Sequence, residues 1–176
     1  MKLNLLLLFL TFSLSAFAQE TSITLHSKSY PATPIWSFMC DDYVLSGLAT
    51  VQIGKTEKGG LLKISVETSN NTFAITGTLY VDLKDFNAII CTDKGNRTVE
   101  GNHIISYYSL TQAEISRLQK VDIEAVRFFI SGKKTSFSSQ TGYFTAVNKK
   151  KFFRTAYDAE VKSHETAAAI KDLFKR

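Results

Sequence analysis

The sequence LLKISVET at residues 61–68 alternates large apolar and polar side chains over most of its length. In an extended chain its apolar members share one face and its polar members the other: Leu62, Ile64 and Val66 against Lys63, Ser65 and Glu67. A period of two is typical of a β-strand with one buried and one solvated face. This stretch therefore predicts a sheet that covers a core on one side only.

The same pattern recurs downstream in FAITGTLYVD, at residues 73–82. The intervening SNNT, residues 69–72, is made of residues that favour turns and tolerate unusual backbone angles. Two alternating segments joined by such a turn are typical of a β-hairpin. We therefore expect the segments 61–68 and 73–82 to pair with each other.

Further strands are predicted on both sides of this pair. Turn residues recur roughly every 8 to 12 positions, as in a sandwich or small barrel. The expected strands, beginning upstream, cover about residues 45–53, 87–92, 103–109, 121–130 and 135–147, the last bent at Gly142. No proline follows Pro34, so no backbone N–H donor is lost to proline in this region. The sequence predicts an antiparallel meander, sandwich-like or closed into part of a barrel.

Two helices interrupt or follow the strands. Thr111 and Glu114 have the spacing of a capping box, and Leu110 can pack on Ile115, so we expect a short helix near residues 111–120. From 151 to 174 apolar and charged residues recur at helical spacing, which predicts a C-terminal amphipathic helix. The predicted class is α+β and mainly antiparallel β.

The first 18 residues have the organisation of a secretory signal peptide. Lys2 precedes an apolar run, and the segment closes on Ala16, Phe17 and Ala18. The run is shorter than the roughly 20 residues of a spanning helix, which disfavours a membrane anchor. We expect cleavage after Ala18, a polar entry arm at 19–34, and one β-rich domain at 35–176. The mature protein is expected in the periplasm or outside the cell, without a transmembrane segment.

Export gives the two cysteines a specific interpretation. In an oxidising compartment an even number of thiols favours a bridge, and Cys40 and Cys91 can pair in only one way. Such a bridge closes a loop of about 50 residues, worth about 4 kcal/mol in the chain-entropy model. The alternative is two buried thiols that pack as small apolar groups. The sequence predicts the Cys40–Cys91 disulfide.

Charge is distributed unevenly along the chain. Residues 133–176 contain ten basic and four acidic residues, whereas residues 19–132 contain ten basic and twelve acidic ones. The cations Lys149, Lys150, Lys151 and Arg154 surround two phenylalanines and form a candidate patch for an anionic partner or membrane surface. The alternative is a solvated connection whose phenylalanines belong to the core. Export disfavours nucleic acid as the partner.

Local motifs for catalysis, cofactors or metals are absent from the sequence. The HEXXH zinc motif that His164 and Glu165 would begin fails at Ala168. Cys40, followed by two aspartates, could in principle meet His103 in a thiol–histidine site, but nothing nearby prepares this thiol as a nucleophile. We therefore predict no catalytic, cofactor-binding or metal-ligating residues.

These observations favour an exported, non-catalytic binding or interaction module, whose partner is a protein or a component of the cell envelope. The first alternative is a barrel-like or cup-like carrier of an apolar small molecule. Its cavity would be lined by four aromatic residues: Trp36, Phe38, Tyr107 and Phe129. The second alternative is an enzyme whose active-site residues are dispersed along the chain.

Overall fold

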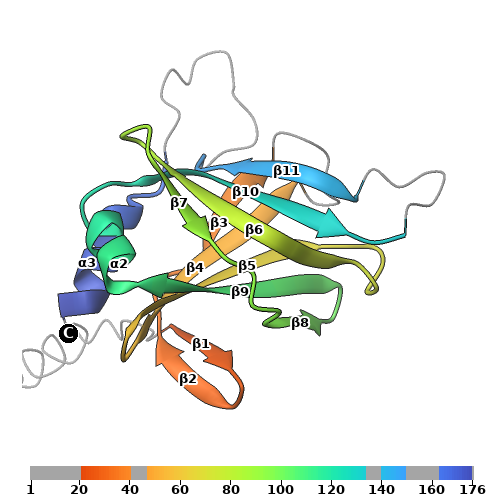
Figure 1. The fold of residues 1–176 in the computed structure, drawn as a ribbon, viewed down its shortest axis with the longest axis horizontal. Helices are drawn as coiled ribbons and strands as arrows, with labels where there is room; N and C mark the ends of the chain where they lie inside the picture. Colours follow the sequence, from red (N-terminus) through yellow and green to blue (C-terminus); the bar gives the residue numbers. More distant parts are fainter. Residues whose placement is uncertain (1–20, 41–46, 134–139, 150–162, 176) are drawn as a thin grey trace, which may run out of the picture.

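The computed structural model describes residues 21–40, 47–133, 140–149 and 163–175 (Figure 1). The elements, in chain order, are β1 (Ser22–Leu25), β2 (Lys28–Pro31), β3 (Trp36–Cys40), β4 (Leu48–Thr56), β5 (Gly59–Glu67), β6 (Ala74–Leu83), β7 (Ala88–Cys91), β8 (Arg97–Glu100), β9 (His103–Thr111), α2 (Gln112–Leu118), β10 (Ile123–Ser131), β11 (Gly142–Val147) and α3 (Thr166–Lys175). No helix within these ranges is long and apolar enough to cross a membrane.

A nine-stranded antiparallel sheet dominates the molecule, with the strand order β7-β6-β10-β11-β3-β4-β5-β9-β8. The strands β1 and β2 form a separate hairpin. The prediction of an α+β fold, mainly antiparallel β, with a short mid-chain helix and a C-terminal helix is confirmed. The sheet is not closed into a barrel.

The predicted hairpin between residues 61–68 and 73–82 is wrong. Both edges of β5 are occupied by other strands, β4 on one side and β9 on the other, while β6 pairs with β10 and β7. At the end of β5 the N–H of Thr68 donates to the carbonyl of Asn102, and the N–H of Ser69 donates to Oε1 of Gln140. These bonds fix the chain where it leaves β5. The next strand, β6, lies in the other half of the sheet, between β7 and β10.

The sheet curls so that its two ends approach each other. The strands β7 and β8 are opposite edges of the sheet, yet only residues 92–96 join them in the chain. Figure 1 shows β6, β10 and β11 in one layer and β5 and β9 in the other. Between β6 and β9 the hydroxyl of Tyr108 donates to the carbonyl of Gly77. We call this contact, together with Asp93, which accepts from the N–H of Gly77, the seam.

The main core fills the concave side of the curl. It is built from inward-facing residues of both layers, among them Phe38, Leu62, Val81 and Phe128, all at most 1% exposed. The helices α2 and α3 lie together at one end of the curl (Figure 1), where Ile115, Leu118 and Ile170 join this core.

A second, smaller cluster lies on the outer face of β4, β5 and β9. The entry arm, predicted as a polar segment, forms the β1–β2 hairpin over this face. Ile23 and Ala32 pack there against Leu61, Ile105 and Tyr107. The β1–β2 hairpin therefore covers part of the outer face of β5 and β9, and Ala32 forms a bridge to Gly54 of β4.

Both predicted helices are present, and the C-terminal helix begins later than predicted. The capping box of α2 is present, with the Thr111 side chain accepting from the N–H of Glu114 and the Glu114 side chain accepting from the N–H of Thr111. The C-terminal helix starts only at Thr166, because residues 163–165 are not helical. The first part of the predicted helix, residues 151–162, lies outside the described residues.

The predicted disulfide between Cys40 and Cys91 is not formed. Cys40 ends β3 and Cys91 ends β7, and three strands separate β3 from β7 in the sheet. A bridge needs the two Cα atoms within about 7 Å, whereas neighbouring strands alone lie about 4.8 Å apart. Cys91 is instead buried in the main core, as the alternative interpretation of the sequence described.

Candidate functional site

A groove of about 230 Å³ opens on the outer face of the sheet, beside the β1–β2 hairpin. Its lining comes from β4, β5, β8 and β9 and from the segment that leads into β3: Ile35, Thr50, Gln52, Lys63, Ser65, Glu100, His103 and Ile105. We call this the outer groove. It is the candidate site of the protein because polar side chains from four strands lie together there over a floor of paired strands.

The register of the strands places the floor residues in rows across the sheet. Thr50 on β4 faces Ser65 on β5, and Ser65 faces Ile105 on β9. In the next row Gln52 faces Lys63. Their neighbours along the strands point into the main core, and successive side chains of a strand alternate between its faces. The core therefore holds the floor of the groove in place from behind.

Gln52 connects this floor to the wall above it. The residue is 4% exposed, and its Nε2 donates to the carbonyl of Thr33 at 2.8 Å. Thr33 also bonds to β4 through its own N–H and its hydroxyl, which contact the O and N of Ile53. The segment is fixed just before Ile35, a wall residue that is 60% exposed. Gln52 thus contributes one of the three bonds that hold this side of the groove on β4.

Ser65 is the most informative residue of the outer groove. Ser65 as a whole is only 6% exposed, and its hydroxyl makes no hydrogen bond to any described residue. Among the described residues, Thr141 and not Ser65 has a fully buried side-chain oxygen without a partner, so the Ser65 hydroxyl reaches solvent through the groove. The hydroxyl of Thr50, in the same row, also makes no hydrogen bond to any described residue.

Charged side chains lie at opposite ends of the groove. Lys63 lies in the row of Gln52, and His103 and Glu100 face each other two rows away on β9 and β8. Within the described residues, neither Lys63 nor Glu100 forms an ion pair, and none of the three forms a hydrogen bond through its side chain. The groove therefore presents a cation and an anion that the protein itself does not neutralise.

The sequence contained the signal for this site, but its meaning depended on the tertiary structure. Lys63 and Ser65 fall on the polar face of the 61–68 strand, where solvent exposure is the ordinary expectation. Ser65 is buried because Ile105 of β9 and the segment before β3 lie near it in space. Neither of those neighbours is close to it in sequence.

Of the predicted anionic-partner patch, only Lys149 lies in the described part of the chain. It is half-buried just after β11, and its N–H donates to the carbonyl of Val147. Lys150, Lys151 and Arg154 lie outside the described residues. Contact of this segment with an anionic surface stays a prediction.

The four aromatic residues expected to line a carrier cavity do not come together. Trp36 and Phe38 pack in the main core, and Tyr107 packs under the β1–β2 hairpin. Phe129 lies on the outer face of β10, where its ring is 4.8 Å from the ring of Tyr143. These residues occupy three separate places, so they do not form the walls of one cavity.

Cys40 and His103 lie on opposite faces of the sheet. Cys40 packs against the main core, whereas His103 lines the outer groove. The thiol–histidine arrangement considered from the sequence is therefore not assembled. Among the residues that the structure describes, no group of three His, Cys, Asp or Glu side chains is placed to hold a metal ion.

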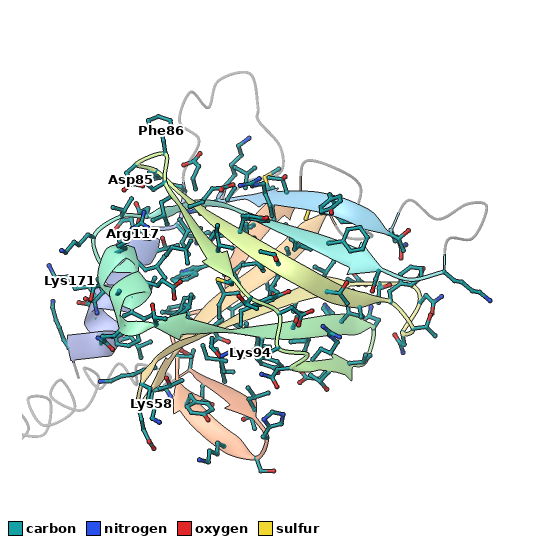
Figure 2. All side chains as sticks on the ribbon, viewed as in Figure 1. Lys58, Asp85, Phe86, Lys94, Arg117 and Lys171 are labelled. Carbon is teal, nitrogen blue, oxygen red and sulfur yellow. The ribbon has the colours of Figure 1, made fainter. Side chains whose placement is uncertain are left out.

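A second exposed surface lies on the outer face of the other half of the sheet. Arg127 donates from Nε and one terminal nitrogen to both oxygens of Asp82, and its guanidinium lies 4.8 Å from the ring centre of Tyr80. Nearby, Tyr143 is 83% exposed. Phe86, at the turn between β6 and β7, is fully exposed with φ of 62° and points away from the sheet (Figure 2). On this surface the charges of Arg127 and Asp82 are paired with each other, unlike those of Lys63 and Glu100 in the outer groove.

Comparisons with models of protein families, with curated proteins and with solved structures find no match to this chain.

Proposed function

We propose that the protein is an exported, non-catalytic binding module that holds a small polar ligand in the outer groove. The observation that carries the proposal is the groove itself, whose floor presents the hydroxyls of Ser65 and Thr50, neither of them hydrogen-bonded to a described residue. A ligand could hydrogen-bond to these hydroxyls in place of water.

The shape of the site also favours binding. Pockets that hold small molecules are concave, largely preformed, and carry a few converging polar groups between apolar walls. The outer groove has an apolar wall in Ile35 and an apolar floor residue in Ile105, and most of its polar groups lie on strands that pack against the core. Binding therefore costs little ordering of the protein.

Binding is proposed in preference to catalysis because the groove shows no activated nucleophile. Ser65 and His103 both line it, but no hydrogen bond joins them. A serine nucleophile requires its base within about 2.6–3.2 Å. The polar side chains of the groove are instead placed to contact a ligand.

The test is a binding screen by two-dimensional NMR on the mature protein. A panel of amino acids, short peptides, monosaccharides and disaccharides is added singly, and amide shifts are followed at Thr50, Ser65 and Ile105. We expect at least one compound to shift these amides saturably. Ser65→Leu, which fills the groove, should abolish the shifts, and Ser65→Ala should weaken them. The control Thr145→Leu makes a similar change on the outer face of β11, outside the groove. Shifts that persist in Ser65→Leu would contradict the proposal.

A further inference from the structure

The two ends of the outer groove differ in charge, and this difference restricts the class of ligand. Lys63 provides a cation at one end, and Glu100 provides an anion beside His103 at the other. A ligand with a single charge would satisfy one end and leave the other facing a neutral group. A ligand that carries an anion and a cation at its two ends would satisfy both.

The length of the groove can be estimated from the strand register. Lys63 faces Tyr107 on β9, and His103 is four residues earlier on the same strand. At about 3.4 Å per residue the two rows are about 14 Å apart along the strand. An extended peptide spans about 3.3–3.6 Å per residue, so the ends of a tripeptide are about 10 Å apart. The side chains of Lys63 and Glu100 are long enough to make up the difference.

The middle of the groove offers groups that match a peptide backbone. The hydroxyls of Ser65 and Thr50 can donate to carbonyl oxygens or accept from N–H groups. The Nε2 of Gln52 donates to the carbonyl of Thr33. No described residue donates to the Oε1 of Gln52, so this oxygen can accept a hydrogen bond from a ligand. The aliphatic side chains of Ile35 and Ile105 provide apolar contacts for small side chains.

From this arrangement we propose that the ligand of the outer groove is a short peptide with free termini, about three residues long, with its carboxylate at Lys63 and its amino group at Glu100. The proposal rests on the proposed binding function and names the ligand class for the same site. A neutral oligosaccharide, the main competitor, matches the hydroxyl groups of the groove but leaves both charges without a partner.

The test uses four forms of trialanine on the mature protein: with free termini, with an acetylated amino end, with an amidated carboxyl end, and with both ends blocked. Dissociation constants come from NMR titration of the amides of Thr50, Ser65 and Ile105. We expect the free peptide to bind most tightly and each block to weaken binding about fivefold, the value of one partly exposed charge pair.

Two variants assign each terminus to its residue. Lys63→Gln should weaken binding of the free peptide about fivefold, and amidation of the peptide should then have no further effect. Glu100→Gln should likewise weaken binding of the free peptide about fivefold, and acetylation of the peptide should then have no further effect. The controls are Lys58→Gln, an exposed cation in the turn between β4 and β5 (Figure 2), and Glu124→Gln on β10, neither of which lines the groove. Both should bind like the wild type.

The outcomes separate the ligand class from the site. If all four peptides bind equally, or if Lys63→Gln weakens the free and amidated peptides alike, the assignment of the termini is overturned. If maltotriose shifts the groove amides and no peptide does, the peptide proposal fails while the binding site stands. If neither these probes nor the earlier panel shifts the groove amides, both proposals fail.

Discussion

The phenolic oxygen of Tyr108 on β9 donates a hydrogen bond to the carbonyl oxygen of Gly77 on β6, across 3.2 Å. These strands belong to opposite halves of the sheet and are not neighbours in its hydrogen-bonded order. The N–H of the same glycine donates to a carboxylate oxygen of Asp93, at 2.8 Å. Side chains thus satisfy both backbone groups of Gly77 where the curled sheet does not close.

Removal of the Tyr108 hydroxyl should weaken the seam. We expect Tyr108→Phe to lower the free energy of unfolding by about 1–2 kcal/mol, because the ring stays packed while the carbonyl of Gly77 loses its partner. Urea denaturation monitored by circular dichroism measures this change. Tyr107→Phe is the matched control, since Tyr107 is equally buried but its hydroxyl makes no hydrogen bond within the described residues. Equal losses in the two variants would argue against a specific role for the Tyr108 bond.

The contribution of Asp93 should depend on pH. Desolvation alone would raise the pKa of Asp93, but hydrogen bonds from the N–H groups of Gly95 and Gly77, together with Arg97, outweigh it, so the pKa lies below its usual value. A lowered pKa in the folded state stabilises the fold above the unfolded pKa of about 3.8, and this stabilisation disappears as the pH falls through the folded pKa.

We therefore expect Asp93→Asn to destabilise the protein at pH 7 and to converge with the wild type as the pH falls below about 4. Urea denaturation at pH 7, 5 and 3.5 gives the comparison. Asp172→Asn is the control, because Asp172 forms an exposed pair with Lys175 on α3, and such pairs contribute little. A wild-type advantage over Asp93→Asn that is the same at every pH would contradict this account.

The turn of the β1–β2 hairpin can be improved. His26 and Ser27 adopt φ values of 49° and 63°, the left-handed region that costs an ordinary residue roughly 1–2 kcal/mol. A two-residue turn of this kind favours Asn followed by Gly. We expect the double variant His26→Asn, Ser27→Gly to raise the melting temperature, measured by calorimetry. Ser29→Gly, placed in β2 where no positive φ is required, should lower it, and stabilisation by both variants would be unexpected.

The cysteines should behave as two thiols, one of which is unreactive in the folded protein. Burial, followed by the charge of Glu114, raises the pKa of Cys91 to about 12, so almost none of it is thiolate at pH 8. In Cys40→Ala, which leaves Cys91 alone, we expect negligible reaction with a disulfide reagent until urea is added. The unfolded, unreduced wild type should titrate as two thiols. A titration that finds none would restore the bridge.

Local patterns in the sequence predicted local structure correctly. The alternation at 61–67 identified Leu62, Ile64 and Val66 as core residues, and Thr111 with Glu114 identified the start of α2. Both features depend on residues within a few positions of each other. Pairing does not, because β5 lies between β4 and β9, and Ser65 faces Ile105, which is distant in the chain. The turn residues at 69–72 favour a change of direction without specifying which strand comes next to β5.

The outer groove could not be predicted from the sequence for the same reason. Lys63, Ser65 and Glu100 are ordinary residues for a solvated strand face, and no motif joins them. Their shared site results from the register of three strands and from the position of Ile35. The disulfide prediction relied on compartment and on an even number of cysteines, and neither specifies how many strands separate two residues.

The interior position of β4, β5 and β9 in the sheet, each with a neighbouring strand on both sides, has a consequence for the dynamics of the groove. Amide protons in such strands exchange with solvent mainly through global unfolding, whereas edge strands such as β7 and β8 open locally. Residues 50, 52, 63 and 65, which form most of the floor, lie on β4 and β5. Local opening at the edges of the sheet therefore leaves this floor intact, and partly opened forms of the protein retain it.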